Sequence, residues 1–222
     1  MKNILLVGSN SSVCKKFVHK YEHKYNFIQL SRSSQFSDTK NFDLFDSDTY
    51  YDNELDYDGL IYFPGTINLK QFEKININEF EEDFKINVLG LINILKFYKK
   101  KLNKNSSIVL FSTVATLQGM PYHSSTSMVK SAINGLTISL AAEWAPKIRV
   151  NCISPSLFES NMSSRFFSSE KSIERISNNH PLKRTGTTDD IASIINFLIS
   201  EESSWITGQN FSIDGGMSSL RL

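Results

Sequence analysis

Short apolar runs alternate with amphipathic stretches along the chain, and this alternation constrains the fold more than any other feature of the sequence. Runs that are rich in β-branched or aromatic residues predict buried strands. They lie at 3–7, 27–30, 60–63, 107–111, 148–153 and 211–213. Because parallel neighbours need crossover connections, strands that alternate with helices predict a parallel sheet covered on both faces. We therefore expect an α/β fold with a doubly wound parallel sheet.

The helices are predicted from apolar residues that recur at helical spacing. The first carries its inner face from Val13 to Tyr25, and the second keeps helical spacing from Phe80 to Leu102. A third helix begins near Thr126, where Ser124 or Ser125 is available as its N-cap. A fourth covers 190–199.

Length and composition fit one soluble domain over residues 1–222. A formal net charge of +1 gives no reason to expect a nucleic acid or an anionic membrane as partner. The first residues hold too short an apolar run for a signal peptide, and no segment reaches membrane-spanning length, so we expect a cytoplasmic protein. Cys14 and Cys152 are expected to be reduced and buried. His19 and His23 have no further ligand nearby in sequence, so no metal site is predicted.

The carboxyl ends of the strands are the expected ligand-binding edge, because ligands of open parallel sheets bind there. Thr126 and Lys130 lie one turn apart on the helix that follows the strand at 107–111, so both are expected near this edge. Residues 156–180, rich in Ser and Phe, are predicted to form a substrate lid. Four further residues end predicted strands at this edge: Gly8, Gly65, Thr113 and Pro155.

Three stretches carry a resemblance to a known family. They are HPLKRTGTTDDIASIINFLISEESSWITGQNFSIDGG (180–216), NCISPSLFESNM (151–162) and FKINVLG (84–90). Through them the chain resembles the short-chain dehydrogenase/reductase family over essentially its whole length. The resemblance implies a Rossmann-type fold and hydride transfer between a nicotinamide cofactor and a small or carrier-bound carbonyl or alcohol. It also implies a homodimer or homotetramer that pairs through the long helices.

The family's catalytic positions are carried over residue by residue. Lys130 matches the lysine of its Tyr-x-x-x-Lys motif, Asn87 its proton-relay asparagine, and Thr113 the serine that holds the substrate oxygen. Thr126 stands where the family has its acidic tyrosine, and an aliphatic alcohol is a much weaker acid than a phenol. Tyr122, in the preceding loop, is a candidate substitute acid, and His123 ranks below it.

The family's cofactor positions are also altered. Its glycine-rich turn keeps Gly8 but has Ser12 and Cys14 at the later glycines, which reduces the room for the pyrophosphate. Arg32 follows the second strand, where no carboxylate appears in 29–34, so NADP is preferred and NAD stays possible. The resemblance assigns seven further residues to the cofactor: Asn10, Val13, Asp43, Gly65, Lys130, Pro155 and Ser160.

Two functional hypotheses follow from these matches and departures. The first is a divergent NADP-dependent oxidoreductase in which Thr113, Thr126 or Tyr122 orients and protonates the substrate oxygen. The second is a protein of the same fold that has lost hydride transfer and serves as a binding or assembly partner. The retained Asn87 and Lys130 favour the first hypothesis, and the altered glycine turn favours the second.

Overall fold

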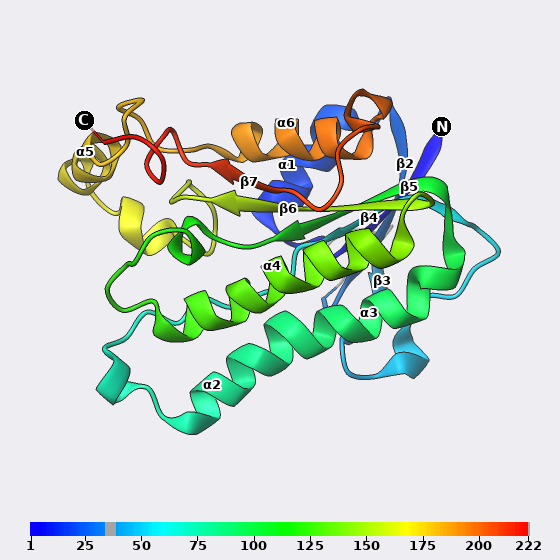
Figure 1. Cartoon of the computed structure of the whole chain (residues 1–222), viewed down its shortest axis with the longest axis horizontal. Helices are drawn as coiled ribbons and strands as arrows, with labels where there is room; N and C mark the ends of the chain where they lie inside the picture. Colours follow the sequence, from blue (N-terminus) through cyan, green and yellow to red (C-terminus); the bar gives the residue numbers. More distant parts are fainter. Residues whose placement is uncertain (34–38, 222) are drawn as a thin grey trace.

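The chain folds around one seven-stranded sheet whose paired strands all run parallel (Figure 1). The structure is a computed structural model that describes residues 1–33 and 39–221. The strand order is β3-β2-β1-β4-β5-β6-β7. The strands are β1 (Lys2–Val7), β2 (Tyr25–Ser31), β3 (Thr39–Asn41), β4 (Tyr57–Tyr62), β5 (Leu102–Phe111), β6 (Ile148–Pro155) and β7 (Asn210–Ile213).

Helices cover both faces of this sheet, which confirms the predicted doubly wound α/β architecture (Figure 1). On one face α1 and α6 pack Phe17 and Ile195 against the strands, and on the other α3 and α4 pack Leu91 and Ile133. The α-helices are α1 (Ser12–Tyr21), α2 (Ile77–Phe84), α3 (Gly90–Tyr98), α4 (Ser124–Trp144), α5 (Glu170–Asn178) and α6 (Thr188–Ile199). Single-turn 3₁₀ helices lie at 47–49, 72–74, 99–101, 114–116, 164–167 and 201–203.

Two boundaries of the sequence prediction were wrong near the first sheet edge. Tyr25 begins β2 instead of ending the first helix, which stops at Tyr21. Its ring stacks on Phe17 of that helix at 6.2 Å between centroids, so it belongs to the same apolar cluster without being helical. The short strand β3 was missed because it is a polar segment with two exposed residues and no apolar alternation.

The second helix is shorter than predicted and is interrupted. A π-helical turn at Lys85–Leu89 separates α2 from α3, and the polypeptide turns after Tyr98 into the ten-residue strand β5. Apolar spacing does not distinguish an α-turn from a π-turn, and the exposed polar residues early in β5 give no strand signal. The cap of α4 was also wrong: His123 is its N-cap, and Ser124 and Ser125 are already helical.

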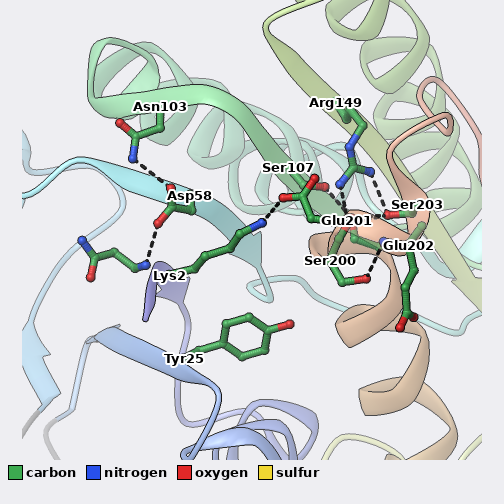
Figure 2. Close-up of polar contacts among 12 residues, drawn as sticks. Lys2, Tyr25, Asp58, Asn103, Ser107, Arg149, Ser200, Glu201, Glu202 and Ser203 are labelled. Atoms are coloured by element: carbon green, nitrogen blue, oxygen red, sulfur yellow. Dashed lines mark hydrogen bonds and ion pairs between the residues drawn. The ribbon is translucent and has the colours of Figure 1, made fainter.

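At the amino ends of the strands, hydrogen bonds and an ion pair join the strands to the segment that follows α6 (Figure 2). Arg149 of β6 donates to the carbonyl oxygens of Ser200 and Ile206 and to the hydroxyl of Ser203, so it satisfies groups that follow α6. Lys2 of β1 forms an ion pair with Glu201, which lies in the same segment after α6.

Within the described ranges, no helix is long and apolar enough to cross a membrane.

Candidate functional site

Two cavities open at the carboxyl ends of the central strands. The larger, of about 460 Å³, is bordered by the turn that joins β1 to α1, and the smaller, of about 290 Å³, by the segment between β6 and α6. They share part of their lining, so a ligand that fills one adjoins a ligand in the other. The shared residues are Ile67, Ser112, Lys130, Pro155, Phe158, Ser160 and Met162.

Lys130 is the charged group at this shared wall. The second turn of α4 carries it, its side chain is 7% exposed, and its Nζ donates to the carbonyl oxygen of Phe111 at 3.1 Å. Burial lowers the pKa of Lys130 to about 8, and the nearby Cys152 has a smaller opposing effect. The amino group of Lys130 is therefore mostly protonated at neutral pH and is available as a hydrogen-bond donor at the junction of the cavities.

Gly65 lets Lys130 and Asn87 come together. A Cβ at this glycine would lie 2.9 Å from Asn87 Oδ1, closer than real Cβ atoms come to a neighbour, and 3.0 Å from Lys130 Nζ, which is tighter than most real Cβ contacts. Asn87 is completely buried in the π-helical turn, and its Nδ2 donates to the hydroxyl of Thr66 and to the carbonyl of Asp83. Three predicted site residues, Gly65, Asn87 and Lys130, are thus brought together.

A buried carboxylate supports this arrangement from behind. Asp83, on α2, accepts hydrogen bonds from the hydroxyls of Thr66 and Ser125, both at 2.5 Å. Because Thr66 also accepts from Asn87, one polar chain links α2, the π-helical turn, the end of β4 and the start of α4. The sequence interpretation missed Asp83. The signal was present, since Asp83 precedes Asn87 by one helical turn on the inward face of an amphipathic helix.

Thr126 lines the smaller cavity, but its hydroxyl is already engaged. The side chain is 3% exposed, and Oγ1 donates to the carbonyl oxygen of Asn68 and accepts from its backbone N–H, each at 3.1 Å. It therefore ties the segment after β4 to α4. Thr113 lines the same cavity, and its hydroxyl oxygen accepts from the backbone N–H of Ala115 at 3.3 Å. Its hydroxyl proton is not used in that bond.

The two loop candidates for the acid line different hollows. Tyr122 has a positive φ of 67°, is 55% exposed and lines a separate hollow together with Leu69, Lys70, Gln71 and Lys74. His123 lines the cavity that contains Thr113, Thr126 and Lys130. The left-handed backbone at Tyr122 is a conformation that sequence spacing does not reveal.

The turn after β1 provides backbone and polar groups at the larger cavity. Gly8 has φ +81°, and a Cβ there would lie 2.9 Å from Pro64 Cδ, so this position requires glycine. Within the part of the chain that the structure describes, Ser9 Oγ and Asn10 Oδ1 are buried without a hydrogen-bond partner. Ser12 Oγ accepts from the backbone N–H of Asn161 at 3.0 Å. Asn10, Ser12 and Val13 all line the larger cavity.

The remaining predicted cofactor residues are more scattered. Pro155 and Ser160 line both cavities, and the Ser160 hydroxyl contacts that of Ser163 at 2.9 Å. Arg32 is exposed just after β2, and its neighbour Ser34 lies outside the described residues. Asp43 is exposed after β3, and its carboxylate accepts from the backbone N–H of Phe45. Neither Arg32 nor Asp43 lines one of the two cavities.

The segment predicted as a lid covers the smaller cavity. It contains a 3₁₀ turn at 164–167 and α5, and it contributes both apolar and polar side chains to the lining. His180 at its end is 3% exposed, with Nδ1 2.7 Å from the carbonyl oxygen of Ile176 and Nε2 2.8 Å from the Ser156 hydroxyl. This buried contact was not predicted, because Ser156 and His180 are too far apart in sequence for a spacing argument.

Comparison with known proteins gives consistent relationships. A family model described as Enoyl-(Acyl carrier protein) reductase matches residues 53–218. Tropinone reductase-like 3 from Erythroxylum coca is 36% identical over 133 residues, 60% of this chain and 52% of that protein. A 3-oxoacyl-(acyl-carrier-protein) reductase, FabG, from Aquifex aeolicus is 28% identical over 221 residues, 96% of this chain and 86% of that protein.

The matched segments span between 52% and 65% of the length of three curated relatives, so the match to these proteins is partial. Among solved structures, ElxO with NADP bound superposes with a TM-score of 0.83 at 27% identity. The superposition covers 99% of this chain and 100% of that one. The sheet and its helices therefore follow an arrangement seen in a solved structure.

Proposed function

The chain belongs to the short-chain dehydrogenase/reductase family, and we propose that it is an NADP-dependent oxidoreductase acting on a small or carrier-bound carbonyl or alcohol. One observation carries the proposal. Gly65, Asn87 and Lys130 converge where a cavity large enough for part of a dinucleotide meets a smaller, mainly apolar cavity. This arrangement suits two ligands that must touch.

The larger cavity fits a nicotinamide dinucleotide in several respects. Asn10 lines this cavity, and its buried Oδ1 lacks a partner within the described residues, so a polar ligand atom would satisfy it. The amino end of α1 offers backbone N–H groups for a pyrophosphate, and Gly65 leaves the space that a Cβ would fill. When bound, the nicotinamide supplies or accepts the hydride. Lys130 would hold the ribose hydroxyls, and Pro155 and Ser160 would border the nicotinamide amide.

Arg32 supports the preference for NADP over NAD. It follows β2, where a guanidinium can pair with a 2′-phosphate, and ElxO, 27% identical to this chain, was solved with NADP. Asp43 is proposed to lie beside the adenine. Both assignments depend on where the adenosine end of the cofactor leaves the larger cavity.

In the smaller cavity Thr113 is the proposed hydrogen-bond partner of the substrate oxygen, because its hydroxyl proton has no acceptor among the described residues. Thr126 acts differently from a tyrosine at its position. Its hydroxyl holds Asn68, so it shapes the wall of the cavity and does not donate to a ligand. The lining by Ile67, Leu157 and Phe166 favours a substrate with an apolar body.

Titration with NADPH and NADH, followed by calorimetry, tests this function. We expect saturable binding of both, with NADPH bound more tightly, and NADPH oxidation with at least one carbonyl substrate. Arg32→Ala should weaken NADPH binding about tenfold or more and leave NADH binding unchanged, since each charge-assisted hydrogen bond contributes about 1.5–3 kcal/mol. No binding of either cofactor at millimolar concentration would overturn the proposal and leave a non-catalytic role for this fold.

Self-association stays a prediction that the surface supports. Phe84, Leu89 and Met128, from α2 to α4, border one hollow and expose 39%, 42% and 45% of their surface. A second copy of this face would bury them in a dimer. Sedimentation velocity tests this, and a monomer at micromolar concentration would contradict it.

A further inference from the structure

Reduction of a carbonyl requires a proton donor for the oxygen, and the expected donors do not fill that role. Thr126 uses its hydroxyl in two bonds to Asn68, and an aliphatic alcohol is in any case a weak acid. Tyr122 lines a separate hollow whose lining includes neither Thr113 nor Lys130. The proton donor must therefore be sought among the other side chains of the smaller cavity.

Three titratable side chains line that cavity within the described residues: His123, Lys130 and His180. His180 has no free N–H. A carbonyl oxygen only accepts, so Nδ1 donates to Ile176, and Nε2 is occupied by its hydrogen bond with the Ser156 hydroxyl at 2.8 Å. Lys130 lies at the wall shared with the larger cavity and donates to Phe111, where it is proposed to serve the cofactor.

His123 has the geometry that the other two lack. Its Nδ1 lies 2.7 Å from the carbonyl oxygen of Pro121, so Nδ1 carries a hydrogen whether the ring is neutral or charged. Nε2 is then the ring nitrogen that is left for a ligand. The residue is held in place as the N-cap of α4, where its own carbonyl accepts from the N–H of Ser127 at 2.7 Å. Imidazole is the side chain whose ordinary charge change falls nearest to neutral pH.

From this geometry we infer that His123 protonates the substrate oxygen, in place of the tyrosine that the family uses; the inference rests on the proposed oxidoreductase function. The substrate carbonyl gains one hydride at carbon and one proton at oxygen and becomes an alcohol. The hydride and its two electrons come from the reduced nicotinamide, which is oxidised. The proton comes from Nε2 of the imidazolium, the C=O π pair forms the new O–H bond, and the neutral imidazole regains a proton from solvent.

Variants at His123 test this role. With ethyl acetoacetate, benzaldehyde and acetoacetyl-coenzyme A as probes, His123→Ala should lower kcat for NADPH-dependent reduction about 10²- to 10⁴-fold. The dissociation constant for NADPH should not change. Imidazole added to the buffer should restore part of the lost rate, because it can occupy the space of the missing ring. His23→Ala, in the exposed turn after α1, is the matched control and should behave as wild type.

Chemical labelling gives a readout that does not depend on turnover. Diethyl pyrocarbonate acylates a free imidazole nitrogen, so mass spectrometry should find His123 modified and His180 unmodified. NADP⁺ together with an alcohol product should protect His123 from modification.

The outcomes separate this inference from the proposed function. Wild-type kcat in His123→Ala, a loss that imidazole does not restore, a raised dissociation constant for NADPH, or an unreactive His123 would overturn the His123 assignment and leave the oxidoreductase function standing. A wild-type protein that reduces none of the probes and binds no cofactor would overturn both.

Discussion

Replacing Lys130 by Met should make the protein more stable at neutral pH while it abolishes activity. The buried ammonium has no carboxylate partner among the described residues, and burial moves its pKa from 10.5 to about 8. At about 1.4 kcal/mol per pKa unit, the folded state disfavours the charged form by roughly 3 kcal/mol. Met removes this penalty but leaves the carbonyl of Phe111 unpaired, at a cost of about 1 kcal/mol. The net gain is about 2 kcal/mol at pH 7.

The pH dependence of this gain follows from proton binding by the two states. Below about pH 8 the lysine is protonated in both the folded and the unfolded chain, so the whole penalty is present. Between about 8 and 10.5 the unfolded chain binds more protons, and wild-type stability rises with pH relative to the variant. Above 10.5 both states are neutral and the penalty is gone. The advantage of Lys130→Met should therefore disappear across this interval.

Urea unfolding of both proteins, followed by circular dichroism from about pH 7 to about pH 10.5, measures the difference. Burial raises the pKa values of Tyr25 and Tyr57 to about 12, so these phenols lower stability at high pH in both proteins alike. Subtracting the two curves isolates Lys130. A variant less stable than wild type at pH 7, or a difference that stays constant with pH, would refute the reasoning.

Two further predictions concern the groups around Lys130. Gly65→Ala places a Cβ within 3.0 Å of two buried polar atoms, so we expect a loss of about 1–3 kcal/mol in urea unfolding and weaker NADPH binding. Gly135→Ala, in open space on α4, should instead gain about 0.8–1 kcal/mol, and equal effects would contradict the packing argument. Asp83→Ala leaves the buried hydroxyl of Ser125 and the partly buried hydroxyl of Thr66 without their acceptor and should lose about 2–5 kcal/mol. Asp83→Asn retains polar partners and should lose about 1 kcal/mol; an equal loss in both variants would count against the network.

The architecture was predictable because its signals are local. Each central strand is an apolar run, as in Ile4 to Val7, and α1, α4 and α6 keep an apolar stripe, so alternation alone gave the doubly wound sheet. The errors lie where a local signal was weak. β3 is polar, β5 begins with exposed residues, and the π-helical turn has the same apolar spacing as an α-helix.

The sequence predicted the sheet edge at which the candidate site lies, but not how the side chains of the adjoining loop are placed. Gly65 and Lys130 follow from the rule that ligands bind at the carboxyl ends of parallel strands, and the resemblance added Asn87. The placement of the two candidate acids could not be read from spacing, since Tyr122 and His123 are neighbours in one loop, yet Tyr122 has a positive φ and lines a separate hollow while His123 lines the smaller cavity. Loop backbone conformations depend on tertiary contacts that spacing does not encode.

The distribution of unfavourable features favours a working ligand site over a scaffold that serves only in assembly. Lys130 is charged and desolvated, Gly8 adopts a left-handed conformation, and two buried polar atoms of Ser9 and Asn10 lack partners within the described residues. Each of these typically costs about 1–3 kcal/mol or restricts the sequence to glycine. These features border the two cavities or the turn beside them, although the Ser106 hydroxyl of β5, opposite Ile148, is also buried without a partner among the described residues. A ligand would relieve the costs at the cavities, because bound polar groups satisfy the orphaned atoms and share the ammonium. Cofactor binding should therefore raise the stability of the wild-type chain more than that of Lys130→Met.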